Sequence, residues 1–118
     1  MADLSFGNLD FDVEQLSQIS GGDTAFEQEL LQLYVDDTAE HLTKIEAAIA
    51  PLDITEIEEL AHHVKGSSLN IGLIEMARCA ENLEKSAHQE QSAVFHSLSS
   101  QMGGIFNQFR SYLQAESH

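Results

Sequence analysis

Hydrophobic residues recur every three or four positions along most of this 118-residue chain, which is the spacing that buries one face of an α-helix. No stretch alternates hydrophobic and polar residues in the way that a half-buried strand does. The pattern therefore predicts helices and no strands. It places the helices approximately at residues 12–19, 25–49, 54–69, 73–89 and 92–114.

Glycine and acidic residues at the ends of these stretches support the predicted boundaries. A glycine pair that begins at Gly21 ends the first helix, and Asp23 or Thr24 can then cap the second. Asp53, followed three residues later by Glu56, resembles a capping box at the start of the third helix. Short connections of this kind place successive helices side by side.

Each long stretch contains a stripe of residues that we expect to face a shared core. These residues are Phe26, Leu30, Leu33, Tyr34, Leu42, Ile45 and Ile49; Ile57, Leu60, Ala61 and Val64; Leu73, Ala77, Ala80, Leu83 and Ala87; and Phe95, Leu98, Met102, Ile105, Phe106, Phe109 and Leu113. The sequence thus favours an all-α fold, an up-and-down antiparallel four-helix bundle with a short additional N-terminal helix. Gly103 and Gly104 within the last helix indicate close packing or a kink.

The length of the chain fits one domain, because 118 residues bury enough apolar surface for one core but not for two. We expect residues 1–10 to form a flexible lead-in and residues 11–116 to form the domain. Twenty acidic residues against five lysines and arginines give a formal net charge of −15. This charge repels nucleic acid and anionic membranes at long range, so we expect protein partners instead.

Cysteine content and hydropathy indicate where the protein works. Cys79 is the only cysteine, so the chain forms no internal disulfide, and its place in an apolar stripe indicates that it is buried. No signal-peptide pattern opens the chain, and no apolar run reaches the roughly 20 residues of a membrane-spanning helix. The sequence therefore predicts a cytoplasmic protein. Its methionine start favours a free-standing chain over a module excised from a larger kinase.

The third predicted helix places a histidine on its exposed side. At about 100° per residue, His62 lies roughly 160° from Val64, the centre of the buried stripe. Lys65 lies within roughly 60° of His62 and Gly66 within about 40° on the same projection. Leu69 continues this exposed strip one turn later. His63 lies about 100° from the core centre on the other flank, where a histidine hydrogen-bonded to a neighbouring helix is expected.

The residues around His62 suit a phosphoryl carrier. Neutral imidazole is a nucleophile near physiological pH, and Lys65 can neutralise part of the charge of a phosphoryl group. Gly66 costs about 1 kcal/mol relative to alanine inside a helix, so it indicates that an incoming domain needs room there. Glu58 and Glu59 lie one turn before His62, where they favour the protonated imidazole and repel a phosphate, or simply solubilise the helix.

The run from Ala61 to Leu73, which reads AHHVKGSSLNIGL, resembles the signature of histidine phosphotransfer domains. That signature has an Ala-His pair, then Leu-Lys-Gly-Ser, and a second glycine further on. The resemblance extends to the acidic start of the chain, the glycine step, the long helix that contains phenylalanine, and the pair Leu83 and Glu84. Three departures are His63, which adds a second imidazole, Val64, which replaces the commoner leucine, and His88, which stands where some members have a basic residue facing the site.

This resemblance implies that His62 accepts a phosphoryl group from a receiver-domain aspartate and donates it to another receiver, so the protein is a carrier rather than an enzyme. It implies receiver domains and a sensor or hybrid histidine kinase as partners, a monomer, and no metal or cofactor here, because Mg²⁺ belongs to the partner receiver. By the same mapping, Lys65 steadies the phosphoryl group. The residues expected at the docking surface are Gly66, Ser67, Ser68, Leu69, Glu58 and Glu59, with His88 and Glu84 as possible contacts from the following helix.

Two other functions remain open at this stage. The first is a helical adaptor that binds a signalling partner through the Leu69 strip without phosphate. The second is a metal-binding bundle, since Glu59 and His62 have the Glu-x-x-His spacing of di-iron proteins, although no second such pair is present and His62 points away from the core. The sequence does not identify the kinase or the direction of phosphoryl flow.

Overall fold

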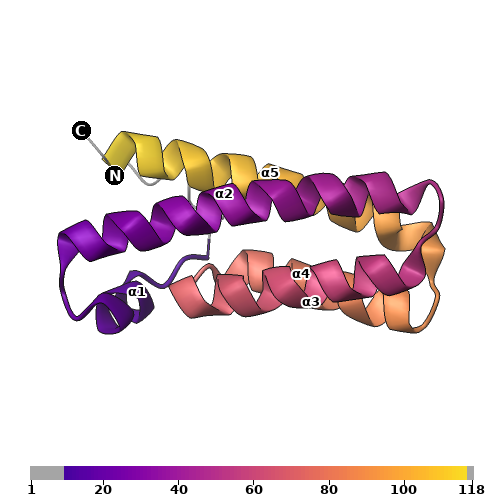
Figure 1. Ribbon diagram of the computed structural model, residues 1–118, viewed down its shortest axis with the longest axis horizontal. Coiled ribbons are helices and arrows are strands. Elements are labelled where there is room, and N and C mark those ends of the chain that lie inside the picture. Colours follow the sequence, from indigo (N-terminus) through magenta and orange to yellow (C-terminus); the bar gives the residue numbers. More distant parts are fainter. Residues whose placement is uncertain (1–9, 117–118) are drawn as a thin grey trace.

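The computed structural model describes residues 10–116 of the chain and contains helices throughout (Figure 1). The predicted short N-terminal helix and four long helices are all present. In chain order the elements are α1 (Val13–Ser20), α2 (Thr24–Ile49), α3 (Ile54–Ile71), α4 (Ile74–His88), a short 3₁₀ turn η2 (Ser92–Val94) and α5 (Phe95–Glu116). Among the residues described, strand-type pairing is limited to one isolated bridge between Phe11 and Leu73.

Aspartate side chains begin the first three helices. Asp12 accepts hydrogen bonds from the backbone N–H groups of the first turn of α1, and Asp23 and Asp53 cap α2 and α3 in the same way. Each cap satisfies N–H groups that have no partner within the helix, and loss of such a cap costs about 1 kcal/mol. The capping positions predicted from the sequence for α2 and α3 are confirmed, with Asp23 rather than Thr24 as the cap of α2. The cap at Asp12 was not predicted.

The four long helices form an antiparallel bundle, as predicted. In Figure 1, α2 and α5 lie along one side of the bundle and α3 and α4 along the other. The closest packing is between α3 and α4, and α2 packs on α3 and α5. Helix α1 lies across one end, where it contacts α2 and α3. The consecutive helices α3 and α4 therefore share the most extensive interface in the bundle.

The predicted stripes of α3 and α4 are buried throughout. In α5, four of the seven predicted residues are buried and the others are partly buried against the same core. Burial of one large apolar side chain contributes about 1.5–3 kcal/mol, so these stripes supply much of the driving force for folding. The fully buried side chains with the largest volumes are Phe95, Phe109, Ile45, Ile57, Leu73, Met76, Leu83 and Met102.

The stripe predicted for α2 is partly wrong. Leu33 is 66% exposed and Phe26 is 41% exposed, whereas the buried face includes Tyr34 and Thr38. The prediction counted only hydrophobic residues, but Thr38 belongs to the buried face. Leu33 precedes Tyr34 by one residue and therefore lies about 100° around the helix from it.

Gly72 joins the N-terminal segment to the end of α3. Its φ is +88°, and a Cβ at this position would collide with the backbone carbonyl oxygen of Asp12. The Asp12 N–H donates to the Gly72 carbonyl at 2.7 Å, and the Ile74 N–H donates to the Asp10 carbonyl at 2.8 Å. Helix α3 therefore ends at Ile71, two residues later than predicted. Apart from Asp10, the predicted lead-in lies outside the described residues.

The glycine pair in α5 does not serve close packing. A Cβ built on Gly103 or Gly104 meets no heavy atom within 4 Å, and α5 continues through both residues. Cys79 is buried as predicted, and burial, together with the nearby Glu75 carboxylate, raises the pKa of its thiol to about 11. None of the described helices is both long enough and apolar enough to cross a membrane.

Candidate functional site

His62 lies on the exposed side of α3, as the helical projection predicted. Its side chain is 68% exposed, and its Nδ1 atom lies 2.8 Å from Oε2 of Glu84 on α4. A carboxylate oxygen only accepts hydrogen bonds, so in the neutral imidazole the hydrogen is on Nδ1 and the lone pair is on Nε2. The contact with α4 therefore selects one tautomer of His62 and leaves Nε2 as the nucleophilic atom.

Lys65 completes a three-residue cluster. Its Nζ atom lies 3.2 Å from Oε1 of Glu84. One oxygen of this carboxylate therefore contacts Lys65 and the other contacts His62. Partial burial raises the pKa of Glu84, but the hydrogen bonds and charges of His62 and Lys65 outweigh burial, and the pKa lies below its ordinary value. Glu84 is therefore a charged acceptor that holds the imidazole, while Lys65 offsets its negative charge.

The space beside His62 is open at Gly66. A Cβ at this residue would meet no heavy atom within 4 Å, and its φ is not in the left-handed region. Neither the fold nor the backbone conformation requires glycine here, although glycine weakens a helix interior. The structure therefore has room for a side chain at this position.

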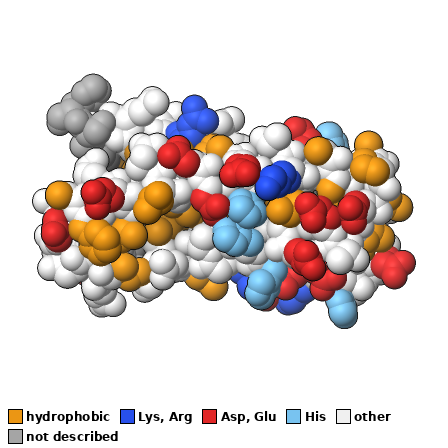
Figure 2. Space-filling view, viewed as in Figure 1, with side chains coloured by type: hydrophobic (Ala, Val, Ile, Leu, Met, Phe, Trp, Pro, Cys, Tyr) orange, Lys and Arg blue, Asp and Glu red, His pale blue; other side chains and the backbone are white. Residues whose placement is uncertain are grey.

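Two shallow hollows flank Glu84. One, of about 370 Å³, is lined by Thr55, Glu58, Glu59, His62 and Glu84. The other, of about 330 Å³, is lined by Glu58, Lys65, Glu81, Glu84, Lys85, His88 and Gln89. Figure 2 shows histidine and acidic side chains gathered in the middle of one face of the bundle, and hydrophobic side chains gathered toward the end where α1 lies.

The other predicted site residues divide into those near His62 and those elsewhere. Nδ1 of His88 lies 3.2 Å from Oε2 of Glu58, so His88 contacts α3 through this carboxylate and not through His62. Glu59 is exposed beside His62 in the first hollow. Leu69 is 48% exposed one turn beyond Gly66, which leaves an apolar side chain on the strip that the sequence predicted.

The two serines have different surroundings. Ser67 is partly exposed, and its hydroxyl donates to the Val64 carbonyl at 3.2 Å. Ser68 is fully buried, and its Oγ lies 2.7 Å from the hydroxyl of Tyr34. The expectation that Ser68 belongs to the docking surface is wrong, because Ser68 follows Val64 by one full turn and shares its buried face.

One cluster of side chains near this site was not predicted from the sequence. His63 is hydrogen-bonded to the neighbouring helix, as expected of a histidine on this flank, and its partner is Asp37 of α2. The His63 ring also stacks on the ring of His41. The four-residue spacing of Asp37 and His41 was the available signal, since residues at i and i+4 share one helix face.

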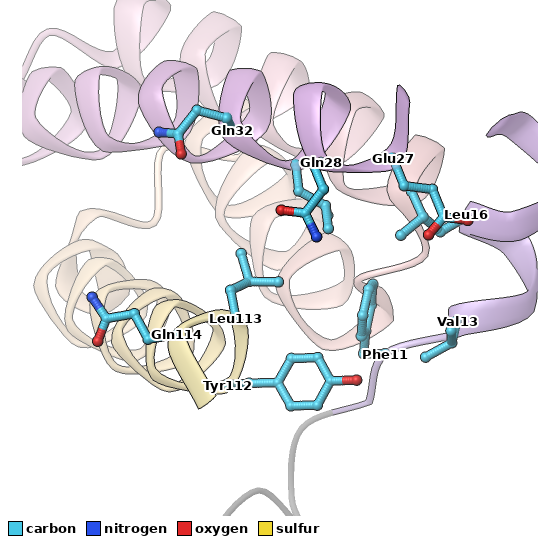
Figure 3. Close-up of a pocket in the computed structure, with 10 residues that line it drawn as sticks. Phe11, Val13, Leu16, Glu27, Gln28, Gln32, Tyr112, Leu113 and Gln114 are labelled. Atoms are coloured by element: carbon cyan, nitrogen blue, oxygen red, sulfur yellow. The ribbon is translucent and has the colours of Figure 1, made fainter. Parts of the chain in front are cut away.

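A pocket of about 390 Å³ lies elsewhere, where α1, α2 and α5 meet (Figure 3). Its walls include Phe11, Leu16, Tyr112 and Leu113, and none of the predicted site residues lines it. The candidate site is thus a surface of α3 and α4 rather than an enclosed cavity. A surface suits a reaction in which the second reactant is held by another protein.

Comparisons with known proteins agree with this geometry. The family model described as "Hpt domain" matches residues 29–115. The histidine-containing phosphotransfer protein B (HptB) of Pseudomonas aeruginosa PAO1 is similar in structure, with a TM-score of 0.85 and 27% identity over 91% of this chain and 93% of that one. The maize phosphotransfer protein ZmHP2 has the same fold, with a TM-score of 0.74 and 21% identity over 88% and 86% of the two chains. A search of curated proteins found no match.

Proposed function

This chain belongs to the Hpt domain family of histidine phosphotransfer proteins, and we propose that it accepts a phosphoryl group on Nε2 of His62 from a receiver-domain aspartate and passes it to another receiver domain. Proteins of this family carry phosphoryl groups and generally are not enzymes. The observation on which the proposal depends is the hydrogen bond of 2.8 Å between Nδ1 of His62 and Glu84. This bond leaves the Nε2 lone pair on the exposed side of α3.

The transfer needs no base on this chain. The Nε2 lone pair attacks the phosphorus of the aspartyl phosphate, the N–P bond forms, and the P–O bond to the aspartate breaks, which returns that residue to a carboxylate. The imidazole gains a positive charge when Nε2 is phosphorylated, and Glu84 balances that charge through Nδ1. The reverse reaction with a second receiver uses the same atoms. We expect Mg²⁺ to be bound by the receiver and not by this chain.

Lys65 and Gly66 fit this role in different ways. Nζ of Lys65 lies 3.2 Å from Oε1 of Glu84, so it offsets the carboxylate charge that would repel the phosphoryl group, and Lys65 follows His62 by about one turn of α3. The open space at Gly66 admits the loop of a receiver to the imidazole. Leu69 and the partly exposed Ser67 extend the docking surface along α3, and Glu58 and Glu59 border it.

The partners in this proposal are receiver domains of response regulators and a sensor or hybrid histidine kinase. We expect the chain to act in the cytoplasm. We also expect a monomer, because one copy presents the whole strip from His62 to Leu69. The formal net charge of −15 favours partners whose docking surfaces are basic or mixed. The identity of the partners depends on surface shape, which differs among receivers that share one fold.

The test is to incubate the wild-type chain with receiver domains carrying labelled phosphate and to measure acid-labile, base-stable label on the chain. We expect label on the wild type and none on His62→Ala. His63→Ala is the matched control, since it removes the adjacent imidazole from the same helix, and it should be labelled. Circular dichroism checks that each variant is folded.

The other outcomes have distinct meanings. In one of them, the wild type takes no label from any receiver and yet binds a receiver as tightly as His62→Ala does. That result would identify an adaptor that works without phosphate. Equal label on the wild type and His62→Ala would move the carrier to another histidine. Either result would overturn the proposal for His62.

A further inference from the structure

Helices α2 and α3 bring two histidines and one aspartate together on the flank of α3 that contacts α2. One ligand atom from each of Asp37, His41 and His63 lies within 4.8 Å of the other two. The His41 and His63 rings are stacked, with centroids 4.0 Å apart and planes 8° from parallel. Among the residues that the structure describes, this is the one group of three or more histidine, cysteine or carboxylate side chains close enough to share an ion.

The hydrogen bonds of the cluster show which nitrogen atoms are available. Nδ1 of His41 lies 2.8 Å from the backbone carbonyl oxygen of Asp37, which only accepts, so Nδ1 carries the hydrogen and Nε2 has the lone pair. A metal-binding histidine is typically oriented in this way, by a hydrogen bond from its other ring nitrogen. Nε2 of His63 lies 2.7 Å from Oδ2 of Asp37. Two ligands about 2.0 Å from a tetrahedral ion are roughly 3.3 Å apart, so these atoms need to separate by only about half an ångström to share one.

We propose that Asp37, His41 and His63 form a zinc site, with one imidazole nitrogen of each histidine and one carboxylate oxygen as ligands and water in the fourth position. Zn²⁺ enters between Nε2 of His63 and the Asp37 carboxylate. In the neutral imidazole, the hydrogen on Nε2 moves through solvent to Nδ1 when the Zn–N bond forms. The rings are parallel in the stack, so the His63 ring turns until its nitrogen lone pair and that of His41 converge on the ion.

The donors favour zinc over harder cations. Two imidazole nitrogens and one carboxylate are ligands that suit Zn²⁺, whereas Mg²⁺ and Ca²⁺ prefer oxygen ligands throughout. The His63 side chain is 49% exposed, so its ring has space to turn, and His41 at 17% is held by α2. The strongly negative chain also raises the local concentration of cations.

This site is separate from the one around His62. His62 contacts Glu84 on α4, whereas His63, the next residue, contacts Asp37 on α2. Consecutive helical residues point about 100° apart, so the two imidazoles face different neighbouring helices. The zinc site does not depend on the carrier role of His62. An ion bound here would link α2 to α3 and stabilise the folded chain, because the unfolded chain does not hold the three ligands together.

The test is titration of the untagged full chain with ZnCl₂ by isothermal calorimetry, together with thermal unfolding with and without zinc. We expect one Zn²⁺ per chain and a higher Tm with zinc. Replacement of an outer partner of a metal ligand costs about 10–100-fold in affinity, so loss of a direct ligand should cost at least about tenfold. We expect losses of this size in His41→Gln, His63→Ala and Asp37→Asn, and a smaller zinc-dependent rise in Tm in the two histidine variants than in the wild type.

His96→Ala is the matched control, because it removes an exposed histidine of α5 that lies outside the cluster, and its zinc affinity should equal that of the wild type. Circular dichroism of the zinc-free variants establishes that each is folded. Absence of saturable binding to the wild type would overturn the proposal, as would binding that His41→Gln and His63→Ala leave unchanged. Binding lost only in His62→Ala would place the ion beside Glu84 and would overturn it too.

Discussion

Nδ1 of His62 lies 2.8 Å from Oε2 of Glu84, although the two residues are 22 positions apart in the sequence and belong to different helices. The contact fixes the ring orientation and the tautomer of an imidazole that is otherwise exposed. It makes α4 part of the site on α3. Glu84 is therefore a positioning residue for His62, and its effect can be separated from that of the histidine itself.

We expect Glu84→Ala to lower the rate of phosphoryl transfer to His62 by roughly tenfold or more, by analogy with the partners that orient metal-binding histidines, whose loss costs about 10–100-fold. The ring would then populate both tautomers and several orientations. The nitrogen chemical shifts of the His62 imidazole should change from the values of one tautomer to those of a mixture of two. Stopped-flow or quench-flow transfer from a phosphorylated receiver measures the rate.

Two variants are matched to Glu84→Ala. Glu84→Gln keeps an oxygen that accepts from Nδ1, so it should retain more activity than the alanine variant. Glu81→Ala removes a carboxylate of the same helix that pairs with Lys85, and it should transfer at the wild-type rate. An unchanged tautomer and rate in Glu84→Ala would show that Glu84 does not orient His62.

We expect Gly66→Ala to stabilise the chain and slow the transfer. No atom lies within 4 Å of the added Cβ, so alanine should raise the free energy of unfolding by about 1 kcal/mol through its better helix propensity. The same methyl group would obstruct a receiver that approaches His62, and leucine should obstruct it further. Urea unfolding and transfer rates measure the two effects.

Gly104→Ala is the control for this substitution, because its Cβ also meets nothing within 4 Å but lies on α5. It should stabilise the chain by a similar amount and leave transfer unchanged. If Gly66→Ala and Gly66→Leu both transfer as fast as the wild type, then no partner approaches His62 across this residue.

The pKa of Glu84 predicts a pH dependence of stability. Its pKa is lower in the folded chain than its ordinary value of 4.5, so ionised Glu84 contributes stability above that value, and the contribution disappears as pH falls through the lower, folded pKa. We expect the difference in free energy of unfolding between wild type and Glu84→Gln to be constant near neutral pH and to shrink below about pH 4.5. Urea unfolding at successive pH values measures it, and a difference that grows toward acid pH would contradict the sign.

The buried pair of Tyr34 and Ser68 should affect stability and not transfer. Their hydroxyl oxygens lie 2.7 Å apart in the core, and burial is the main reason that the pKa of Tyr34 is raised to about 12. Removal of one partner leaves a buried polar group unsatisfied, so we expect Tyr34→Phe and Ser68→Ala each to cost about 1–3 kcal/mol. The double variant should cost less than the sum of the two.

Urea unfolding of the two single variants and the double variant measures this coupling. Ser68→Ala should still accept label from a phosphorylated receiver under conditions in which it is folded, because Ser68 is fully buried. Slower transfer in a Ser68→Ala variant of unchanged stability would show that this serine contributes to docking after all.

The sequence alone predicted the elements of the fold and the exposure of His62. Helix starts at Asp23 and Asp53 depend on hydrogen bonds within three residues of each cap, and local spacing is enough to find them. The direction of His62 follows from the same logic, since its angle from the buried face of α3 depends only on residues of that helix.

The tertiary structure alone decided how the helices are paired at the site. Glu84 and His88 are one turn apart on α4. The position of α4 along α3 decides that Glu84 pairs with His62 and that His88 pairs with Glu58. The stacking of His41 on His63 depends in the same way on the position of α2. Periodicity fixes an angle around one helix axis, whereas contacts between helices depend on the axial offset of two helices, which is set by packing of the whole core.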